Sequence, residues 1–326
     1  MMGRTHWGWL LLLMLVAAAA VLVNAGSRRV FILHEGRASQ PVAQAFFAAA
    51  EGVLRRSSHL KARHQYLDVR PENCRKALVQ LAAFNPDVVI AEGLQARRCM
   101  AQREADSVHV VVDPATQIRG QGHSAFVAAW AAVLAELSSP AAAVTLLYGD
   151  DAEGRAERDL LIEAASLAGR KIQSVAVATD SDRPMIPAER LGTLDNPVLV
   201  GHTVGEGASA GRDPALRAVF SALQAATPQP IMATRLDRVA LGADMALDQA
   251  PEQRGEQMAL KALRGLPADV AVPPLEMAVA LRSEFAARMG AALPPFYLAS
   301  ARLSGFLATP ENRAGAQPRL APAAAR

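Results

Sequence analysis

The chain has 326 residues, of which 51% are hydrophobic and 20% are charged. This composition is that of a globular protein with a large core, and it excludes a disordered chain, a collagen-like repeat and a small disulfide-rich domain. The 34 basic residues nearly balance the 31 acidic residues. Because no Lys/Arg block of nucleic-acid-binding strength stands out, the charge pattern indicates no nucleic-acid partner.

The first 25 residues have the pattern of an export signal. Arg4 precedes an apolar run that starts at Leu10, and small residues lead up to Ala25. A run of about 14 residues is typical of a signal peptide and is short for a membrane span. We therefore predict a signal peptide over 1–25, cleaved after Ala25, and a mature protein in the periplasm. An uncleaved N-terminal membrane anchor is the alternative, because two tryptophans before the run could lengthen the span.

Strands and helices are predicted to alternate through the first third of the mature chain. Short apolar runs predict strands at 30–33, 66–69, 87–90 and 108–112, and helical periodicity predicts helices at 43–54, 71–84 and 94–103. This alternation is typical of a parallel sheet with helices on both faces.

A second α/β unit is predicted after the break at Asp113-Pro114. Its helices are expected at 124–137, 152–168 and 214–225, and its strands at 144–147, 172–177, 198–200 and 230–232. A helix at 251–264, a strand at 275–281 and a helix at 282–289 follow. Residues 180–195 fit no element, and an Ala/Pro/Arg-rich tail is predicted to be disordered from Gly305 onward.

Two such units in an exported protein predict a ligand site between them. In open parallel sheets, the loops at the carboxyl ends of the strands gather at the ligand crevice. Two lobes that face each other can close on a small molecule by a hinge motion. The pattern therefore favours a binding protein over an enzyme.

One motif suggests an enzyme instead. The segment 207–211 matches G-x-S-x-G, in which Ser209 would be the nucleophile at a sharp turn directly after a strand. The preceding strand ends near Gly201, about eight residues too early, and no histidine follows His202. A hydrolase that uses Ser209 is therefore the disfavoured alternative. The scattered histidines complete no metal site, and no cofactor is predicted.

The two cysteines fit an oxidising compartment. Cys74 lies in one predicted helix and Cys99 in the next. They are candidates for a disulfide. Two buried free thiols are the alternative.

The C-terminal third carries a family resemblance. It has a Gly-Ala opening at Gly242, a helix with an internal glycine at Gly255, a turn at 264–269, and an apolar residue followed by two prolines at 293–295. Upstream, 85–91 has a Pro-Asp pair before an apolar strand. These segments resemble the ABC-transporter substrate-binding proteins of the tryptophan/tyrosine-uptake type, over about 30–300.

The resemblance implies a type I periplasmic-binding-protein architecture, with two hinged, Rossmann-like α/β lobes that have parallel sheets. Lobe 1 would comprise 26–115 and 240–304, lobe 2 would comprise 116–239, and 305–326 would form the disordered tail. It implies a monomer that captures a small polar solute, such as an amino acid, and delivers it to an inner-membrane ABC permease. A non-transport periplasmic accessory or sensor protein of the same fold is the alternative.

Under this resemblance, ligand contacts come from the strand ends of both lobes. The expected residues are His34, Glu35, Glu92 and Asp113 in the first lobe, and Tyr148, Asp150, His202, Thr203, Thr234 and Arg235 in the second. Arg235 could hold a carboxylate with two hydrogen bonds, and Glu92 or Asp113 could accept an ammonium group. Tyr148 is expected to line the cleft and to stack on a planar ligand.

Structural roles are the alternatives for three of these residues. Arg235 could simply pair with Asp237 near the hinge. Glu35 could cap the helix that follows it, and His34 could be a solvated loop residue.

Overall fold

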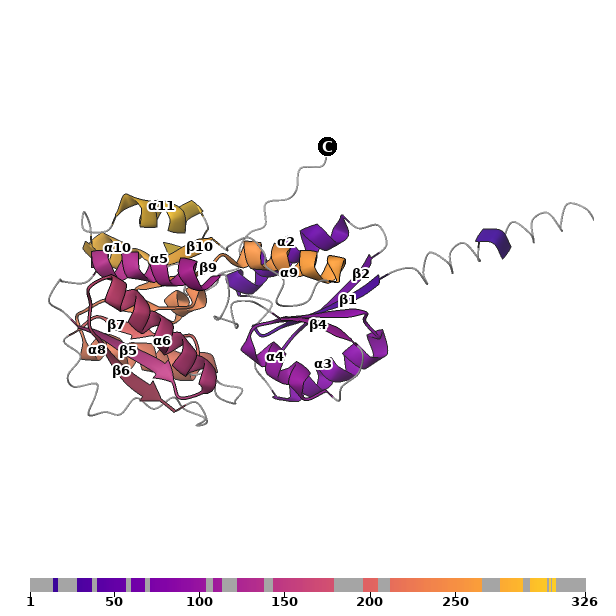
Figure 1. The fold of residues 1–326 in the computed structure, drawn as a ribbon, viewed down its shortest axis with the longest axis horizontal. Coiled ribbons are helices and arrows are strands. Elements are labelled where there is room, and N and C mark those ends of the chain that lie inside the picture. The colour runs from indigo at the N-terminus through magenta and orange to yellow at the C-terminus, as the bar shows by residue number, and fades with distance from the viewer. Residues whose placement is uncertain are drawn as a thin grey trace, which may run out of the picture.

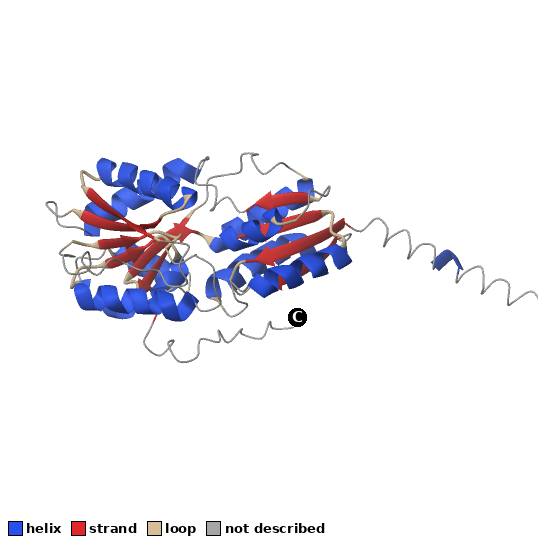
Figure 2. Cartoon of the chain, turned by 90° about the horizontal axis from the view of Figure 1, so that it is seen from below, coloured by secondary structure: helices blue, strands red, loops and turns tan. Residues whose placement is uncertain are grey.

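The described part of the chain folds into two α/β lobes, each built around its own sheet (Figure 1). The computed structural model describes residues 14–16, 28–36, 40–56, 60–67, 71–103, 108–112, 122–137, 143–178, 196–204, 212–265, 276–289, 294–303, 305 and 307–308. Helices flank the sheet of each lobe (Figure 2). The predicted α/β fold with two lobes is confirmed.

The smaller lobe contains a parallel sheet in the order β2–β1–β3–β4. Its elements are β1 (Arg28–His34), α2 (Pro41–Arg55), β2 (Leu60–Tyr66), α3 (Pro71–Phe84), β3 (Val88–Glu92), α4 (Leu94–Ala101), β4 (His109–Val112) and α9 (Pro251–Arg264). Along β1, Val30 and Ile32 pack in the core under α2 and α9, whereas Phe31 and Leu33 pack in the core under α3 and α4. Because both faces are covered there, residues 30–33 of β1 form a continuous apolar run.

The larger lobe contains a sheet in the order β11–β10–β9–β8–β7–β5–β6. Its elements are α5 (Gly122–Leu137), β5 (Val144–Gly149), α6 (Ala152–Leu167), β6 (Ile172–Val177), β7 (Val198–Val200), α8 (Arg212–Ala226), β8 (Ile231–Ala233), the 3₁₀ helix η2 (Leu236–Leu241), β9 (Met245–Gln249), β10 (Met277–Arg282), α10 (Ser283–Met289), α11 (Pro295–Leu303) and β11 (Leu307–Ala308). The strand pairs of this sheet are parallel, as expected, apart from β9 and β10, which are antiparallel.

The C-terminal third is divided between the lobes differently from the expected boundaries. Of the segment 240–304, α9 packs in the smaller lobe, whereas β9, β10 and α11 belong to the larger one. The reason is that β9 extends the larger sheet from β8, and β10 then pairs with β9. In chain order, the described elements up to β4 therefore belong to the smaller lobe, those from α5 to β9 to the larger lobe, α9 again to the smaller lobe, and those from β10 onward to the larger lobe.

Two further expectations need correction. The strand predicted at 66–69 is β2, which lies earlier and is mostly exposed, so it lacks the apolar pattern that marks the other strands. The tail predicted to be disordered from Gly305 contains β11, which pairs with β10 and places Leu307 against the core.

Several predicted features lie outside the described residues. They are the predicted signal peptide apart from 14–16, Asp113, the segment 180–195 and the motif around Ser209. Within the ranges that the structure describes, no helix combines the length and apolar character needed to span a membrane.

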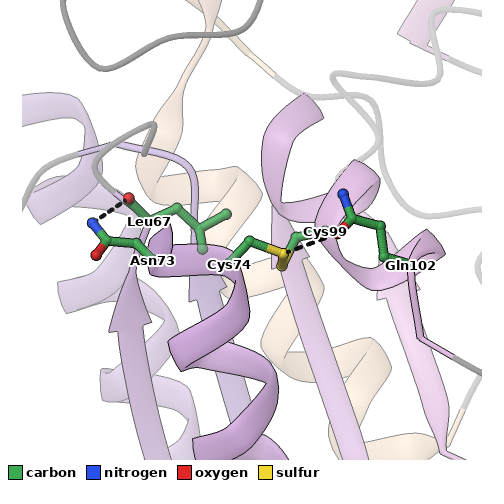
Figure 3. Close-up of a disulfide and its surroundings, with 5 residues drawn as sticks. All are labelled: Leu67, Asn73, Cys74, Cys99 and Gln102. Atoms are coloured by element: carbon green, nitrogen blue, oxygen red, sulfur yellow. Dashed lines mark hydrogen bonds between the residues drawn. A yellow bond between two sulfur atoms is a disulfide. The ribbon is translucent and has the colours of Figure 1, made fainter. Parts of the chain in front are cut away.

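A disulfide joins α3 to α4 (Figure 3). It links Cys74 to Cys99, which are 25 positions apart in the sequence. Cys74 Sγ lies 3.7 Å from Gln102 Oε1, and the Asn73 side-chain amide donates a hydrogen bond to the Leu67 carbonyl oxygen at 2.8 Å. The disulfide links α4 covalently to α3. Helix α4 starts directly after β3, at the junction of the lobes.

Candidate functional site

Glu35 lies where the two lobes meet. It follows β1 and is only 5% exposed. Its Oε1 accepts a hydrogen bond from Arg235 Nη1 of the larger lobe at 3.0 Å, and its Oε2 accepts one from the Gln95 backbone N–H at 3.2 Å. A Cβ added to Gly93, the residue before α4, would lie 2.3 Å from Glu35 Oε2. Glycine therefore makes room for Glu35, and its carboxylate accepts a hydrogen bond at the N-terminal end of α4, where negative charge is favourable.

Arg235 is shared between two carboxylates. Besides Glu35, it binds Asp237 through Nε at 3.1 Å and through Nη2 at 2.9 Å, so the pairing considered from the sequence is present. Burial alone would raise the pKa of Asp237, but the positive charges of Arg235 and Arg238 lower it overall. The guanidinium is thus held in a fixed orientation, with one hydrogen bond extending to the other lobe.

A second set of ion pairs joins the lobes between α4 and the start of α6. Arg97 pairs with Glu153, and Arg98 Nη2 lies 3.3 Å from Asp151 Oδ2. Asp151 is also the N-cap of α6 and accepts a hydrogen bond from the Gly154 backbone N–H at 2.6 Å. Aspartate is a preferred N-cap residue, because its side chain accepts this bond and its charge is favourable at the N-terminal end of a helix. The capping role was predictable from the sequence. The contacts with α4 were not, because partners in different lobes leave no local pattern.

His34 and Glu92 form a buried pair within the smaller lobe. They are register neighbours at the ends of β1 and β3, and His34 Nδ1 lies 3.3 Å from Glu92 Oε2. The His34 ring stacks on Tyr66 with centroids 4.6 Å apart, and its Nε2 has no hydrogen-bond partner within the described residues. His34 is completely buried, so the reading of it as a solvated loop residue is wrong. Arg254 Nη2 lies 3.8 Å from Glu92 Oε1.

A buried carboxylate organises the strand ends of the larger lobe. Glu157 of α6 accepts hydrogen bonds from the His202 backbone N–H at 2.9 Å and from Thr234 Oγ1 at 2.6 Å, and His202 Nδ1 lies 2.9 Å from its Oε2. Burial alone would raise the pKa of Glu157, but His202 and these hydrogen bonds lower it overall. Thr203 accepts a hydrogen bond from the Gly149 backbone N–H at 3.1 Å. Glu157 was missed from the sequence, although a glutamate on the apolar face of a helix is a usable signal.

Solved structures share the fold of this chain, although no protein-family model matches the chain and no curated protein matches it in sequence. An ABC domain from Streptococcus pneumonia in complex with L-Trp is 15% identical, with a TM-score of 0.60 over 84% of this chain and 98% of that one. A conserved domain protein from Vibrio cholerae is 14% identical, with a TM-score of 0.56 and the same coverage. A ligand-free, open substrate-binding protein with adhesive properties from Clostridium difficile is 13% identical, with a TM-score of 0.54 over 82% and 96%.

The chain has the type I periplasmic-binding-protein fold. The predicted resemblance to ABC-transporter substrate-binding proteins is confirmed in the fold, which is all that such low identities show. In this fold, the strand ends at the junction of the lobes are the place where the sequence analysis expected a ligand. Of the predicted residues, the structure brings Glu35 and Arg235 into contact across the lobes. It places His34 with Glu92, and His202 with Thr234, within separate lobes.

Two other predicted residues of this binding-protein fold have different surroundings. Tyr148 packs against the core of the larger lobe, with the Arg158 guanidinium 5.2 Å from its ring centroid. Asp150 is exposed and pairs with Arg155 at 2.8 Å. Asp113 lies outside the described residues.

Side chains of opposite charge meet at the junction of the lobes. Glu35 and Arg235 present opposite charges from opposite lobes, and each is oriented by a second partner in its own lobe. Among the described residues, no group of three or more His, Cys, Asp or Glu side chains could hold a metal ion.

Proposed function

We propose that the protein is a periplasmic solute-binding protein. It captures a small polar solute, such as an amino acid, between its lobes and delivers it to an inner-membrane ABC permease. The observation that supports this most directly is the Glu35–Arg235 contact, in which one lobe offers a carboxylate and the other a guanidinium. A solute that carries both an ammonium and a carboxylate group matches these two charges.

Recognition would proceed by exchange of partners. When the lobes separate, the solute ammonium group binds Glu35 and its carboxylate binds Arg235, which can form two parallel hydrogen bonds with it. Gln95 and Asp237 keep the two side chains oriented during the exchange. Because each end of the solute binds a different lobe, its affinity depends on how the lobes are placed, and binding shifts the protein toward closure.

The similar structures support the same class of ligand. One is in complex with L-Trp and another is a substrate-binding protein. The predicted export signal agrees with capture outside the cytoplasm. A non-enzymatic role is part of this proposal.

A thermal-shift screen over amino acids, small organic acids and nucleosides tests the function. A solute at about 100 times its dissociation constant stabilises the folded state by about 2.7 kcal/mol. Arg235→Gln should abolish the response to carboxylate solutes. Lys171→Gln is the matched control, because it removes the same charge at an exposed position before β6, at the end of the strands away from the junction. No response to any solute, together with unchanged small-angle scattering, would contradict the proposal.

The accessory or sensor role is favoured by one observation. Among the described residues, ion pairs join the lobes at Glu35–Arg235, Arg97–Glu153 and Arg98–Asp151. A change in the placement of the lobes would break these pairs, and a partner that contacts both lobes could respond to that change. Cofractionation with a membrane kinase or enzyme, rather than with a permease, would establish this alternative.

A further inference from the structure

The outer edge of β2 is open within the described residues. β2 is the outermost strand of the smaller sheet and pairs with β1 alone. The Leu67 backbone N–H donates to the His34 carbonyl oxygen, so odd-numbered residues of this segment direct their backbone groups toward β1. The N–H and C=O groups of Ala62 and His64 therefore point outward. An open edge of this kind can pair with another strand.

A pocket adjoins this edge. Its volume is about 250 Å³, and it lies between α2 and the strands. It is lined by Ile32, Phe47, Glu51, Ala62, Arg63 and His64. Burial and the neighbouring His34 lower the pKa of His64, so that its ring adds aromatic surface rather than charge at neutral pH. A pocket of this size suits one apolar side chain rather than a whole drug-sized ligand.

The charge around the edge is positive. Lys61 and Arg63 alternate with Ala62 and His64 along β2, and both are exposed. Exposed Arg28, Arg55 and Arg56 lie at the same end of the lobe, where β1 and β2 start and α2 ends. The one acidic residue of the pocket, Glu51, already pairs with Arg55 at 2.7 Å. Pairing of β2 with β2 of a second copy would bring like charges together, as would pairing with the arginine-rich C-terminal segment of this chain.

We propose that β2 is a docking edge for an extended segment of another protein, in which acidic residues alternate with apolar ones. The segment would add a strand beside β2, with acidic side chains opposite Lys61 and Arg63 and one apolar side chain in the pocket. This mode of recognition combines backbone hydrogen bonds with a side-chain pocket. An anionic lipid surface would use the positive charge but neither the open backbone groups nor the pocket, so the peptide is favoured. The lining of this pocket does not include Glu35 or Arg235, on which the proposed solute site depends.

Two peptides of the length of β2, seven residues, test this proposal by fluorescence anisotropy. The acidic probe is Glu-Val-Glu-Phe-Glu-Val-Glu, and its counterpart has Lys in place of each Glu. The acidic probe should bind, and the lysine probe should not. Ala62→Pro removes one outward N–H, which an edge strand tolerates, and should weaken binding by about tenfold. Arg63→Glu should weaken binding of the acidic probe and strengthen binding of the lysine probe.

A second measurement keeps the test independent of how Ala62→Pro folds. The acidic probe is N-methylated either on its odd or on its even residues, which blocks one of its two backbone edges at a time. One of the two methylated probes should lose binding and the other should keep it. Equal binding of both methylated probes, or of the acidic and lysine probes, would overturn the proposal. So would binding to phosphatidylglycerol vesicles alone, without binding of the acidic probe.

Discussion

Gly93→Ala tests how the contact between the lobes is built. Gly93 has φ 88° and ψ 167°, a region essentially restricted to glycine, where another residue costs about 1–3 kcal/mol. The new Cβ would also lie 2.3 Å from Oε2 and 2.6 Å from Cβ of Glu35, so that Glu35 must move. Its hydrogen bonds with Gln95 and Arg235 would then weaken, and hydrogen bonds to charged groups contribute about 1.5–3 kcal/mol. We expect the free energy of unfolding to fall by about 3–5 kcal/mol.

Urea denaturation followed by circular dichroism measures this loss, and two other glycines serve as matched controls. Gly169 also has a positive φ, 66°, but an added Cβ meets nothing within 4 Å, so Gly169→Ala should cost only backbone strain, about 1–2 kcal/mol. Gly52 lies inside α2 with the same open space, and Gly52→Ala should stabilise by about 0.5–1 kcal/mol. The reasoning is refuted if Gly93→Ala costs no more than Gly169→Ala.

Three further outcomes are expected. Replacing Cys74 and Cys99 by serine should lower the free energy of unfolding by about 3 kcal/mol, because the bond closes a loop of moderate length; an unchanged urea midpoint would contradict this. The folded-state pKa of Glu157 lies below its ordinary value of 4.5. The contribution of this carboxylate to stability is therefore complete above pH 4.5 and is lost as the pH falls below that value. Between pH 7 and pH 3, the melting temperature of Glu157→Gln should fall less steeply than that of the unchanged protein. Replacing Arg97 and Arg98 by glutamine should remove about 0.5–1 kcal/mol per ion pair and increase the radius of gyration in small-angle scattering, and an unchanged radius would show that these pairs do not hold the lobes together.

The rule that ligand-binding residues follow the carboxyl ends of parallel strands located part of the candidate site from the sequence. Glu35 and Arg235 follow apolar strands of different lobes, and the structure brings them together. The rule could not separate residues that face the junction from residues used inside a lobe. Thr203 follows a strand in the same way, yet its hydroxyl accepts a hydrogen bond from the Gly149 backbone and is completely buried. The local sequence pattern shows where a strand ends, but it does not show which residues the side chains at that end contact.

The sequence by itself determined the α/β alternation, because strands buried on both faces must be apolar and the helices that cover them must be amphipathic. It did not determine the place of β2, since an exposed edge strand needs no apolar pattern, nor the lobe to which β9 and β10 belong. Only the tertiary structure decided those points, along with the partners of Glu157 and Arg97. Contacts between residues far apart in the chain depend on how complete sheets and helices pack, and a local pattern of residue types does not carry that information.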